Sequence, residues 1–295
     1  MRMYDICCVG HITLDKVVTP GSEIFMPGGT SFYFSNAIRH FNVKYGLITS
    51  LAASEMRFAE DLVASGIEVR TLPSANTVYF ENSYSLNLDH RTQRVLQTAD
   101  PFTVNQLQQV DATIFHLGPL LADDISVSVI KMLAQKGKVS LDVQGYLRTV
   151  ENKQVMPVDW KDKMQALPYI EILKVNEMEM EVLTALDDVK KAARLLNQWG
   201  AKEVVITLGS KGSVVFTNDT FYTIPAYRPH TQVDATGCGD TYMAGYLYKR
   251  IKGFNPQQAG EFGAAMASIK ISAPGPFIGK EEDVLNLIAS RQKLV

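Results

Sequence analysis

The hydrophobic pattern at the start of the chain predicts one buried strand and one half-solvated strand. Tyr4–Val9 is a short apolar run, which is typical of a core strand. Polar and apolar residues then alternate from Asp15 to Ile24, which indicates an exposed strand. Pro27-Gly28-Gly29 breaks the pattern, and a helix is expected over Ser31–Phe41. A second core strand and a further helix are expected at Tyr45–Thr49 and Glu55–Ser65.

Two polar stretches in the next part of the chain predict a hairpin. Val78–Leu86 and Arg91–Thr98 flank Asn87–His90, which has the composition of a turn. Their many polar positions suggest that one face of the hairpin meets solvent. Together with Lys16–Ile24 the hairpin would form a small β-sheet lid over a site. Such a lid matters wherever a reaction must exclude water.

From residue 112 onward strand and helix patterns alternate, which indicates a parallel sheet with helices on both faces. No internal repeat or low-complexity linker interrupts the chain, so we expect one α/β domain over 1–295 with its lid at about 12–27 and 77–98. Strands are expected at Ala112–Leu117, Val139–Val143, Ile170–Val175 and Glu203–Thr207, and helices at Asp123–Lys136, Glu177–Leu186 and Val189–Trp199.

Polar or glycine-containing segments follow these strands directly. They are Gly118-Pro119, Asp142–Gly145, Asn176-Glu177 and Thr207–Gly209. Ligands of open α/β sheets bind in the crevice at the carboxyl ends of the strands. The four segments are therefore expected to face one active-site crevice.

Composition excludes several classes of protein. The 295 residues are 46% hydrophobic and 20% charged with a net charge of −2, so no polycationic surface is available for nucleic acid or an acidic membrane. The three cysteines form no disulfide framework or zinc spacing, and the adjacent Cys7 and Cys8 are expected to be buried thiols in an apolar strand. No signal-peptide pattern and no apolar run of roughly 18 residues is present. A cytoplasmic location is expected.

The most informative stretch is Asp234–Asp240, which runs into an apolar helix over Thr241–Lys252. Gly237 and Gly239 let the backbone approach a ligand closely, and amides at a helix N-terminus favour an anion. The acidic side chain of Asp240 beside such a turn is suited to act as a base next to a phosphoryl group that is being transferred. The alternative is a tight turn followed by a helix cap.

Two other nucleotide-binding motifs fit the chain poorly. A Rossmann fingerprint would need a third glycine where Tyr242 stands, which disfavours a dehydrogenase. A Walker A loop is absent, because Gly209–Ser213 has the wrong spacing.

Asp234–Asp240 resembles the C-terminal signature of the ribokinase-like, or PfkB, family of sugar and nucleoside kinases. The resemblance implies an α/β fold that is a ribokinase-like three-layer sandwich, with a central mostly parallel sheet, helices on both faces and a small β-sheet lid. It also implies ATP-dependent transfer of the γ-phosphoryl group to a hydroxyl. Asp240 would be the catalytic base, and the amides of Gly237, Cys238 and Gly239 would stabilise the transferring group.

The same resemblance assigns residues to the acceptor side of the site. Asp15 matches an acid that contacts substrate hydroxyls, and Gly28, Gly29 and Asn36 match a glycine pair before a helix with an asparagine. Ser31 or Ser35 are alternatives to Asn36. From the residues alone, Asp15 is equally consistent with a solvated strand acid and Asn36 with a surface helix position.

On the donor side the resemblance implies ATP, Mg²⁺ and a monovalent cation, K⁺. Asn176 and Glu179 match an Asn-X-X-Glu motif that organises Mg²⁺ through water, and they also read as a capping box. Asp234 matches a residue beside the monovalent cation. Thr207, Gly209 and Gly212 match a nucleotide loop, with Ala264 and Ser268 of a helix over Gln257–Ile271 beside the adenine.

Three stretches look closest to myo-inositol kinases within this family: Gly28–Phe32 with Asn36, Asp100–Phe102 and Asp142–Arg148. Gln144 and Arg148 in the last stretch are candidate substrate-binding residues. The expected partners are a small polyol and ATP, without nucleic acid or membrane, and a homodimer through the lid is compatible with the resemblance. A furanose sugar or nucleoside is the alternative acceptor, and a non-catalytic ligand-binding regulator of the same fold is the alternative class.

Overall fold

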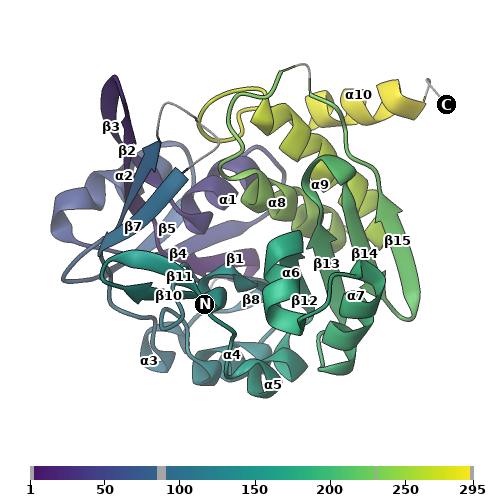
Figure 1. Ribbon diagram of the computed structural model, residues 1–295, viewed down its shortest axis with the longest axis horizontal. Coiled ribbons are helices and arrows are strands. Elements are labelled where there is room, and N and C mark those ends of the chain that lie inside the picture. Colours follow the sequence, from purple (N-terminus) through teal and green to yellow (C-terminus); the bar gives the residue numbers. More distant parts are fainter. Residues whose placement is uncertain (1–2, 85–90, 230, 293–295) are drawn as a thin grey trace.

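The centre of the computed structural model is a sheet with the strand order β15-β14-β13-β12-β9-β8-β1-β4-β5 (Figure 1). The structure describes residues 3–84, 91–229 and 231–292. Strands β5 to β13 in this order pair in parallel, and β14 and β15 add antiparallel at one edge. The strands are β1 (Tyr4–Gly10), β4 (Tyr45–Leu51), β5 (Glu68–Pro73), β8 (Ala112–Gly118), β9 (Lys138–Asp142), β12 (Ile172–Asn176), β13 (Glu203–Thr207), β14 (Ser213–Thr217) and β15 (Thr220–Ile224).

Both faces of this sheet are apolar, as expected for parallel strands that helices cover on each side. In β1, Ile6 and Cys8 enter one hydrophobic core, while Cys7 and Val9 enter the core on the opposite face. One core includes α1 (Thr30–Ile38), α2 (Met56–Ala64), α8 (Cys238–Ile251), α9 (Pro256–Ile271) and α10 (Glu281–Gln292). The other includes α3 (Val104–Leu107), α4 (Val127–Ala134), α5 (Lys163–Ala166), α6 (Glu177–Thr184) and α7 (Val189–Gln198).

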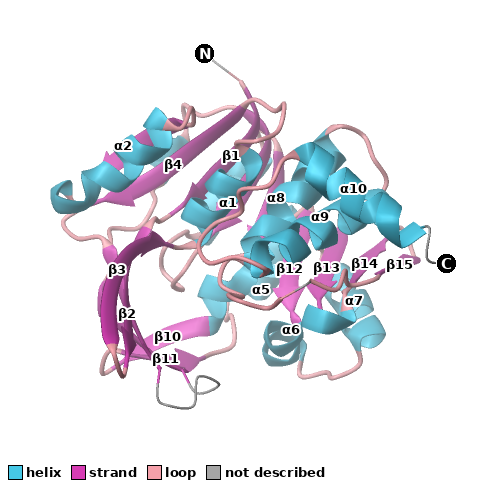
Figure 2. Ribbon diagram, turned by 90° about the horizontal axis from the view of Figure 1, so that it is seen from above, coloured by secondary structure: helices cyan, strands magenta, loops and turns pink. Residues whose placement is uncertain are grey.

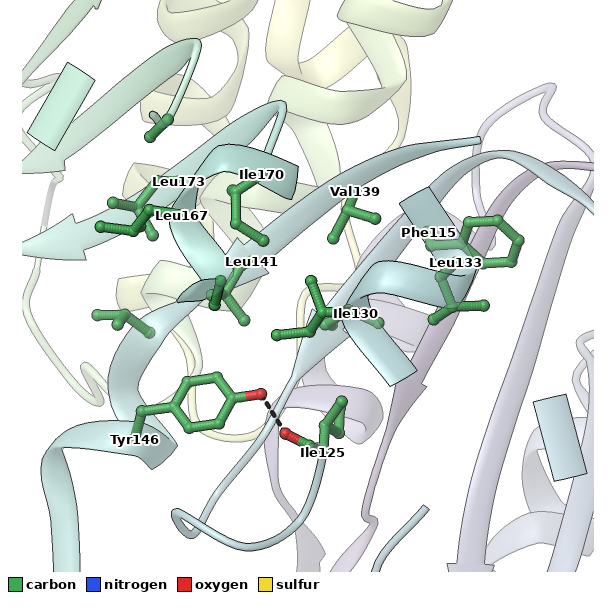
Figure 3. Close-up of a cluster of buried hydrophobic side chains, with 14 of the residues drawn as sticks. Phe115, Ile125, Ile130, Leu133, Val139, Leu141, Tyr146, Leu167, Ile170 and Leu173 are labelled. Carbon is green, nitrogen blue, oxygen red and sulfur yellow. Dashed lines mark hydrogen bonds between the residues drawn. The ribbon is translucent and has the colours of Figure 1, made fainter. Parts of the chain in front are cut away.

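Figure 3 shows how the second core is built around α4. Ile130 and Leu133 of this helix are fully buried beside Phe115 of the sheet. Tyr146 lies at the margin, where its hydroxyl donates a hydrogen bond of 2.5 Å to the carbonyl oxygen of Ile125. This bond ties the segment after β9 to the loop before α4, and it satisfies the one polar atom that the Tyr146 ring would otherwise bury.

A second sheet of order β10-β11-β7-β6-β2-β3 stands at one side of the large sheet (Figure 2). In this sheet β2 pairs with β6 in parallel, and each of these strands also forms an antiparallel hairpin. This is the small sheet expected from the polar hairpin pattern. Its strands are β2 (Thr13–Thr19), β3 (Ser22–Gly28), β6 (Val78–Tyr84), β7 (Arg91–Gln97), β10 (Arg148–Glu151) and β11 (Gln154–Pro157).

The predicted three-layer arrangement with a small sheet is confirmed, with local differences at element ends. The helix expected over Asp123–Lys136 begins only at Val127. The reason is that Asp124 accepts the backbone amides of Leu120 and Leu121, which holds the preceding loop out of the helix. The single strand expected from Asp15 to Ile24 is a hairpin that turns between Thr19 and Ser22. The predicted turn at Asn87–His90 lies outside the described residues.

Sequence patterns missed two hairpins because their turns lack the usual signal. Asn152-Lys153 joins β10 to β11, and Asn218-Asp219 joins β14 to β15, with positive φ at all four residues. Glycine commonly fills such positions, and no glycine marks either turn. β5 and α10 were also not expected. None of the helices in the described part of the chain is long and apolar enough to cross a membrane.

Candidate active site

A cavity of about 1080 Å³ lies between the small sheet and the carboxyl ends of the large sheet. Three of the four polar segments that were expected to converge contribute to its lining, and Gly118-Pro119 does not. Of the candidate residues from the sequence, those that line it are Asp15, Gly29, Gln144, Arg148, Asn176, Thr207, Gly209, Gly212, Gly237, Cys238, Gly239, Asp240, Ala264 and Ser268. Gly28, Asn36, Glu179 and Asp234 are not part of the lining.

The start of α8 forms the floor of this cavity. Gly237 has φ +75°, and α8 begins at the next residue. The Cys238 amide donates to the Ala235 carbonyl oxygen at 3.2 Å, so it closes the turn instead of pointing at a ligand. This leaves the amides of Gly239 and Asp240 in the first turn of the helix as the groups suited to an anion.

The Cys238 thiol is not a candidate nucleophile. Its sulfur lies 3.8 Å from the Ala267 carbonyl oxygen, and burial raises its pKa to about 11. A thiol with this pKa stays protonated near neutral pH. The predicted use of the Cys238 amide for a transferring group does not fit this structure, because that amide bonds to the Ala235 carbonyl oxygen.

A buried lysine that the sequence analysis did not assign lies beside this turn. The Lys174 ammonium is 2.9 Å from Asp142 Oδ2 and 3.7 Å from Glu179 Oε2. A Cβ built on Gly239 would lie 3.4 Å from the same nitrogen, so the ammonium borders the start of α8. Burial alone would lower the pKa of Lys174, but the two carboxylates raise it, and the side chain remains cationic.

Asp240 lies near Lys174 and Asp142, and the pKa of its carboxyl group is raised. Burial and the nearby Asp142 carboxylate raise its pKa to about 7, while Lys174 and a hydrogen bond with Thr30 act in the opposite direction. A carboxyl group that titrates near neutral pH is suited to accept and release a proton in a reaction. Perturbed groups of this kind mark functional sites more often than structural ones.

Asp15 reaches the cavity from the small sheet. Its Oδ1 accepts a hydrogen bond of 2.6 Å from Thr13, and its carboxylate lies over Gly28. A Cβ on Gly28 would come within 2.2 Å of Asp15 Oδ2, so only glycine leaves room for the acid here. Gly28 therefore does not line the cavity itself, but its missing side chain leaves room for Asp15, which does.

Two further polar side chains of the small sheet line the cavity. Strand register places Asn82 opposite Gln93 and beside Val17, on the same face as Asp15 and Phe80. Gln93 Nε2 donates to Asn82 Oδ1 at 3.0 Å. The bond leaves the Asn82 amide nitrogen and the Gln93 amide oxygen for a ligand. In the described part of the chain these two atoms have no other hydrogen bond.

Asn36 was expected either to contact the substrate or to lie on the surface of its helix, and it does neither. It is buried in α1, where its amide nitrogen donates to the Phe32 carbonyl oxygen at 2.9 Å. The cavity is instead reached by Thr30 and Tyr33 of the same helix. The residues beside Gly29 thus face the site from the first turn of α1, one turn before Asn36.

Asn176 and Glu179 form the capping box that their spacing predicts. Asn176 Oδ1 accepts the Glu179 amide and Glu179 Oε2 accepts the Asn176 amide, each at 2.8 Å. Burial raises the pKa of Glu179, and Lys174 opposes this. Among the described residues no group of three or more His, Cys, Asp or Glu could hold a metal alone. The Asn176 amide oxygen and the Glu179 carboxylate are donors of the kind that suit Mg²⁺, which is usually bound by waters, phosphates and only one or two carboxylates.

The β13–β14 connection and α9 also line the cavity. Thr207, Gly209 and Gly212 contribute from the β13–β14 connection, and small residues of α9 face them. Gly212 has φ +94°, and a Cβ there would collide with the Ile224 carbonyl oxygen at 2.1 Å. The turn therefore requires glycine for its own packing, whatever ligand lies beside it.

Asp234 is engaged by the end of α9. The Lys270 ammonium lies 2.9 Å from Asp234 Oδ2 and 2.7 Å from its carbonyl oxygen, and Thr236 donates its amide to Oδ1. Burial would raise the pKa of Asp234, but these hydrogen bonds lower it. The carboxylate is thus ionised and fixed at the loop that leads to Gly237.

Two of the residues that sequence reasoning missed, Lys174 and Asn82, carry a signal that could have found them. Lys174 is a single charge inside the apolar run of β12, and Asn82 is a polar residue that the period of two places on the same face as Phe80. A charge or amide on a buried face needs a partner or a ligand. Thr30 had no such signal, because its contact with Asp240 joins distant parts of the chain.

The comparisons with known proteins agree with this geometry. A model of the pfkB family of carbohydrate kinases matches residues 60–283. The chain is 30% identical over 258 residues to a cytidine kinase of Thermococcus kodakarensis, which covers 83% of this chain and 88% of that protein.

Two solved structures match with a TM-score of 0.85. One is a pyrophosphate-dependent kinase of the ribokinase family in complex with a pyrophosphate analog and myo-inositol, 28% identical and covering 95% of this chain and 99% of that one. The other is a pyrophosphate-dependent myo-inositol-1 kinase that two substitutions convert into a myo-inositol-3 kinase, 29% identical and covering 97% and 99%. The chain belongs to the pfkB family of carbohydrate kinases. It is accordingly a phosphotransferase that acts on a hydroxyl group.

The turn before α8 yields a prediction about Gly237. A Cβ there would lie 2.2 Å from the Tyr33 ring at φ +75°, so Gly237→Ala should lower the thermal midpoint and disturb the cavity floor. Gly253→Ala is the control, because Gly253 has φ +85° with nothing within 4 Å of a Cβ. Both variants carry the backbone strain, about 1 kcal/mol or more, and only the first adds a collision. Equal losses of thermal midpoint would show that Tyr33 does not confine the turn.

Proposed function

We propose that this protein transfers the γ-phosphoryl group of ATP to a hydroxyl of myo-inositol or a close cyclitol. The observation that carries the proposal is the set of polar side chains that face the cavity floor from two sides. Asp15, Asn82 and Gln93 belong to the small sheet, and Gln144 follows β9 of the large one. A cyclitol presents hydroxyls around its whole ring, and each buried hydroxyl needs a partner.

Asp240 is the base in this proposal. It accepts the proton of the acceptor hydroxyl while that oxygen forms a bond to the terminal phosphorus of the donor, whose bond to the leaving phosphate oxygen breaks. Its raised pKa makes it a stronger base than an ordinary carboxylate and still leaves it ionised in an appreciable fraction at neutral pH. Thr30 holds the carboxyl group through the hydrogen bond already described.

Charge on the transferring phosphoryl group is stabilised by fixed groups. Lys174 contributes a buried ammonium next to Gly239, and the first amides of α8 contribute the positive end of the helix dipole. Asp142 and Glu179 keep the ammonium in place. Because these groups are held before the donor binds, little reorganisation is needed during the reaction.

Magnesium fits the donor side of this site. Asn176 and Glu179 would order its waters, and the ion would be held mainly by the phosphates of the donor. Bound there, Mg²⁺ would neutralise charge on the phosphates. The capping box places both side chains at the start of α6, at the carboxyl end of β12.

The size and lining of the cavity favour ATP over pyrophosphate as donor. Pockets of about 300–1,000 Å³ take a drug-sized ligand, so a cavity of about 1080 Å³ has room for a nucleotide beside the acceptor. Its lining includes Ala264, Ala267 and Ile271 of α9, which suit a flat base better than a phosphate. The similarity to pyrophosphate-dependent kinases makes pyrophosphate the alternative donor.

A nucleoside is the second candidate acceptor, and the similarity to a cytidine kinase favours it. A nucleoside would place its ribose against Asp15 and its base toward the small sheet, where Phe80 offers a ring for stacking. The acceptor panel below separates the two candidates.

The free edge of the small sheet supports a homodimer through the lid. β3 is the last strand of this sheet, and Ile24 and Phe25 on it are 54% and 53% exposed. An exposed edge strand with apolar side chains is a site where a second copy can pair.

Replacement of the base tests the mechanism. Asp240→Asn should lower kcat by about 10²–10⁴-fold with little change in ATP affinity, because the amide keeps the shape of the side chain and cannot accept the proton. The same variant should have a higher thermal midpoint than wild type at pH 8. The folded state holds the Asp240 proton more tightly than the unfolded chain, so stability falls as the pH rises toward 7 and the buried charge forms. Turnover close to wild type would remove Asp240 from the mechanism.

An acceptor and donor panel tests the proposed substrates. Steady-state kinetics should give a kcat/KM for myo-inositol at least about tenfold above those for ribose, fructose and cytidine, with ATP preferred to pyrophosphate. Gln144→Ala should raise KM for the cyclitol more than KM for ATP, while the exposed Gln165→Ala should change neither. A preference for cytidine would replace the acceptor, and a preference for pyrophosphate would replace the donor. The family assignment stands in both cases.

A further inference from the structure

Lys270 is a buried cation that the phosphoryl-transfer mechanism above does not use. It lies in the last turn of α9, and its side chain is 0% exposed. Its ammonium donates hydrogen bonds to the Asp234 carbonyl oxygen at 2.7 Å and to Asp234 Oδ2 at 2.9 Å. A buried lysine is costly unless carboxylate and carbonyl oxygens replace its water, and Asp234 supplies both.

This contact controls the segment that leads into the floor of the active site. Asp234 Oδ1 accepts the Thr236 amide at 2.9 Å, one residue before Gly237. The Lys270 ammonium also lies 6.0 Å from the centre of the Tyr33 ring, against which Gly237 packs. The Lys270 ammonium therefore bonds to the segment that enters the turn and also lies over the Tyr33 ring that confines Gly237.

Asp234 is also the residue that the family resemblance places beside a monovalent cation. The residues present do not fit K⁺ at this position, because the Lys270 ammonium already lies at hydrogen-bonding distance from the Asp234 carboxylate and carbonyl oxygens. A potassium ion bound to these oxygens would lie against a like charge. An ammonium carries the same charge and also binds oxygen ligands.

We propose that Lys270 is a built-in cation that takes the place of a dissociable monovalent cation at the turn before α8, so that the enzyme is independent of K⁺. Lys270 is a positioning residue in this proposal. It holds the loop that orients Gly237 and, through it, the first amides of α8. The inference depends on the kinase class and on neither the acceptor nor the donor proposed above.

The wild-type protein provides the first test. Its thermal midpoint should be the same in KCl and in tetramethylammonium chloride at equal ionic strength, and so should its kcat/KM with the best acceptor found. The thermal midpoint needs no substrate, so this test is informative even if the proposed acceptor is wrong. A rise in either quantity that is specific to K⁺ would overturn the proposal.

Removal of the ammonium provides the second test. In tetramethylammonium chloride, Lys270→Met should lower kcat/KM by about tenfold or more, since a displaced turn misplaces the reacting groups. KCl or NH₄Cl should then restore kcat/KM and raise the thermal midpoint of this variant. Lys249→Met is the matched control, because Lys249 is also buried and paired, with Glu281 at 2.7 Å, at the other end of α8.

The control should lose stability without any response to K⁺. A folded Lys270→Met variant that keeps wild-type kcat/KM without added cation would contradict the proposal. So would a loss that KCl and NH₄Cl leave unchanged, because Lys270 would then have only a structural role. If Lys270→Met does not fold, the cation response of the wild-type protein still decides the question.

Discussion

The buried ion pair between Lys174 and Asp142 is the interaction on which the proposed chemistry depends. At 2.9 Å and almost without solvent, it fixes one positive charge beside the start of α8. Without Lys174 the carboxylates of Asp142, Glu179 and Asp240 would repel one another in a poorly hydrated space. With it, Asp240 keeps a pKa near 7, high enough for a base and low enough to ionise.

The fold brings these groups together from strand ends that are far apart in sequence. Lys174 and Asp142 lie on β12 and β9, which are neighbours in the sheet, and the register pairs the two residues directly. Asp240 arrives on α8, which packs against α1, and Asp15 reaches the cavity from the small sheet. The glycines at 28 and 237 allow the close approaches that each side of the cavity requires.

The sequence was sufficient for the architecture and for much of the cavity wall, because both follow from periodicity and from the polar segments at strand ends. Asp240 and Gln144 were predicted there, and the structure places both in the lining. Thr30 was missed because its importance comes from a contact between distant segments, whereas Lys174 was detectable as a single charge inside an apolar strand. Asn36 was predicted from a motif to bind substrate, but its side-chain amide bonds to a carbonyl oxygen of its own helix instead.

The dependence of kcat/KM on pH tests the central claim most directly. If Asp240 is the base, kcat/KM should be lost as the pH falls through about 7, where Asp240 becomes protonated. Asp142→Asn removes a neighbouring negative charge that raises this pKa, so the acid limb should move to lower pH. An acid limb near pH 4 in the wild-type protein, or a limb that Asp142→Asn does not move, would contradict the account.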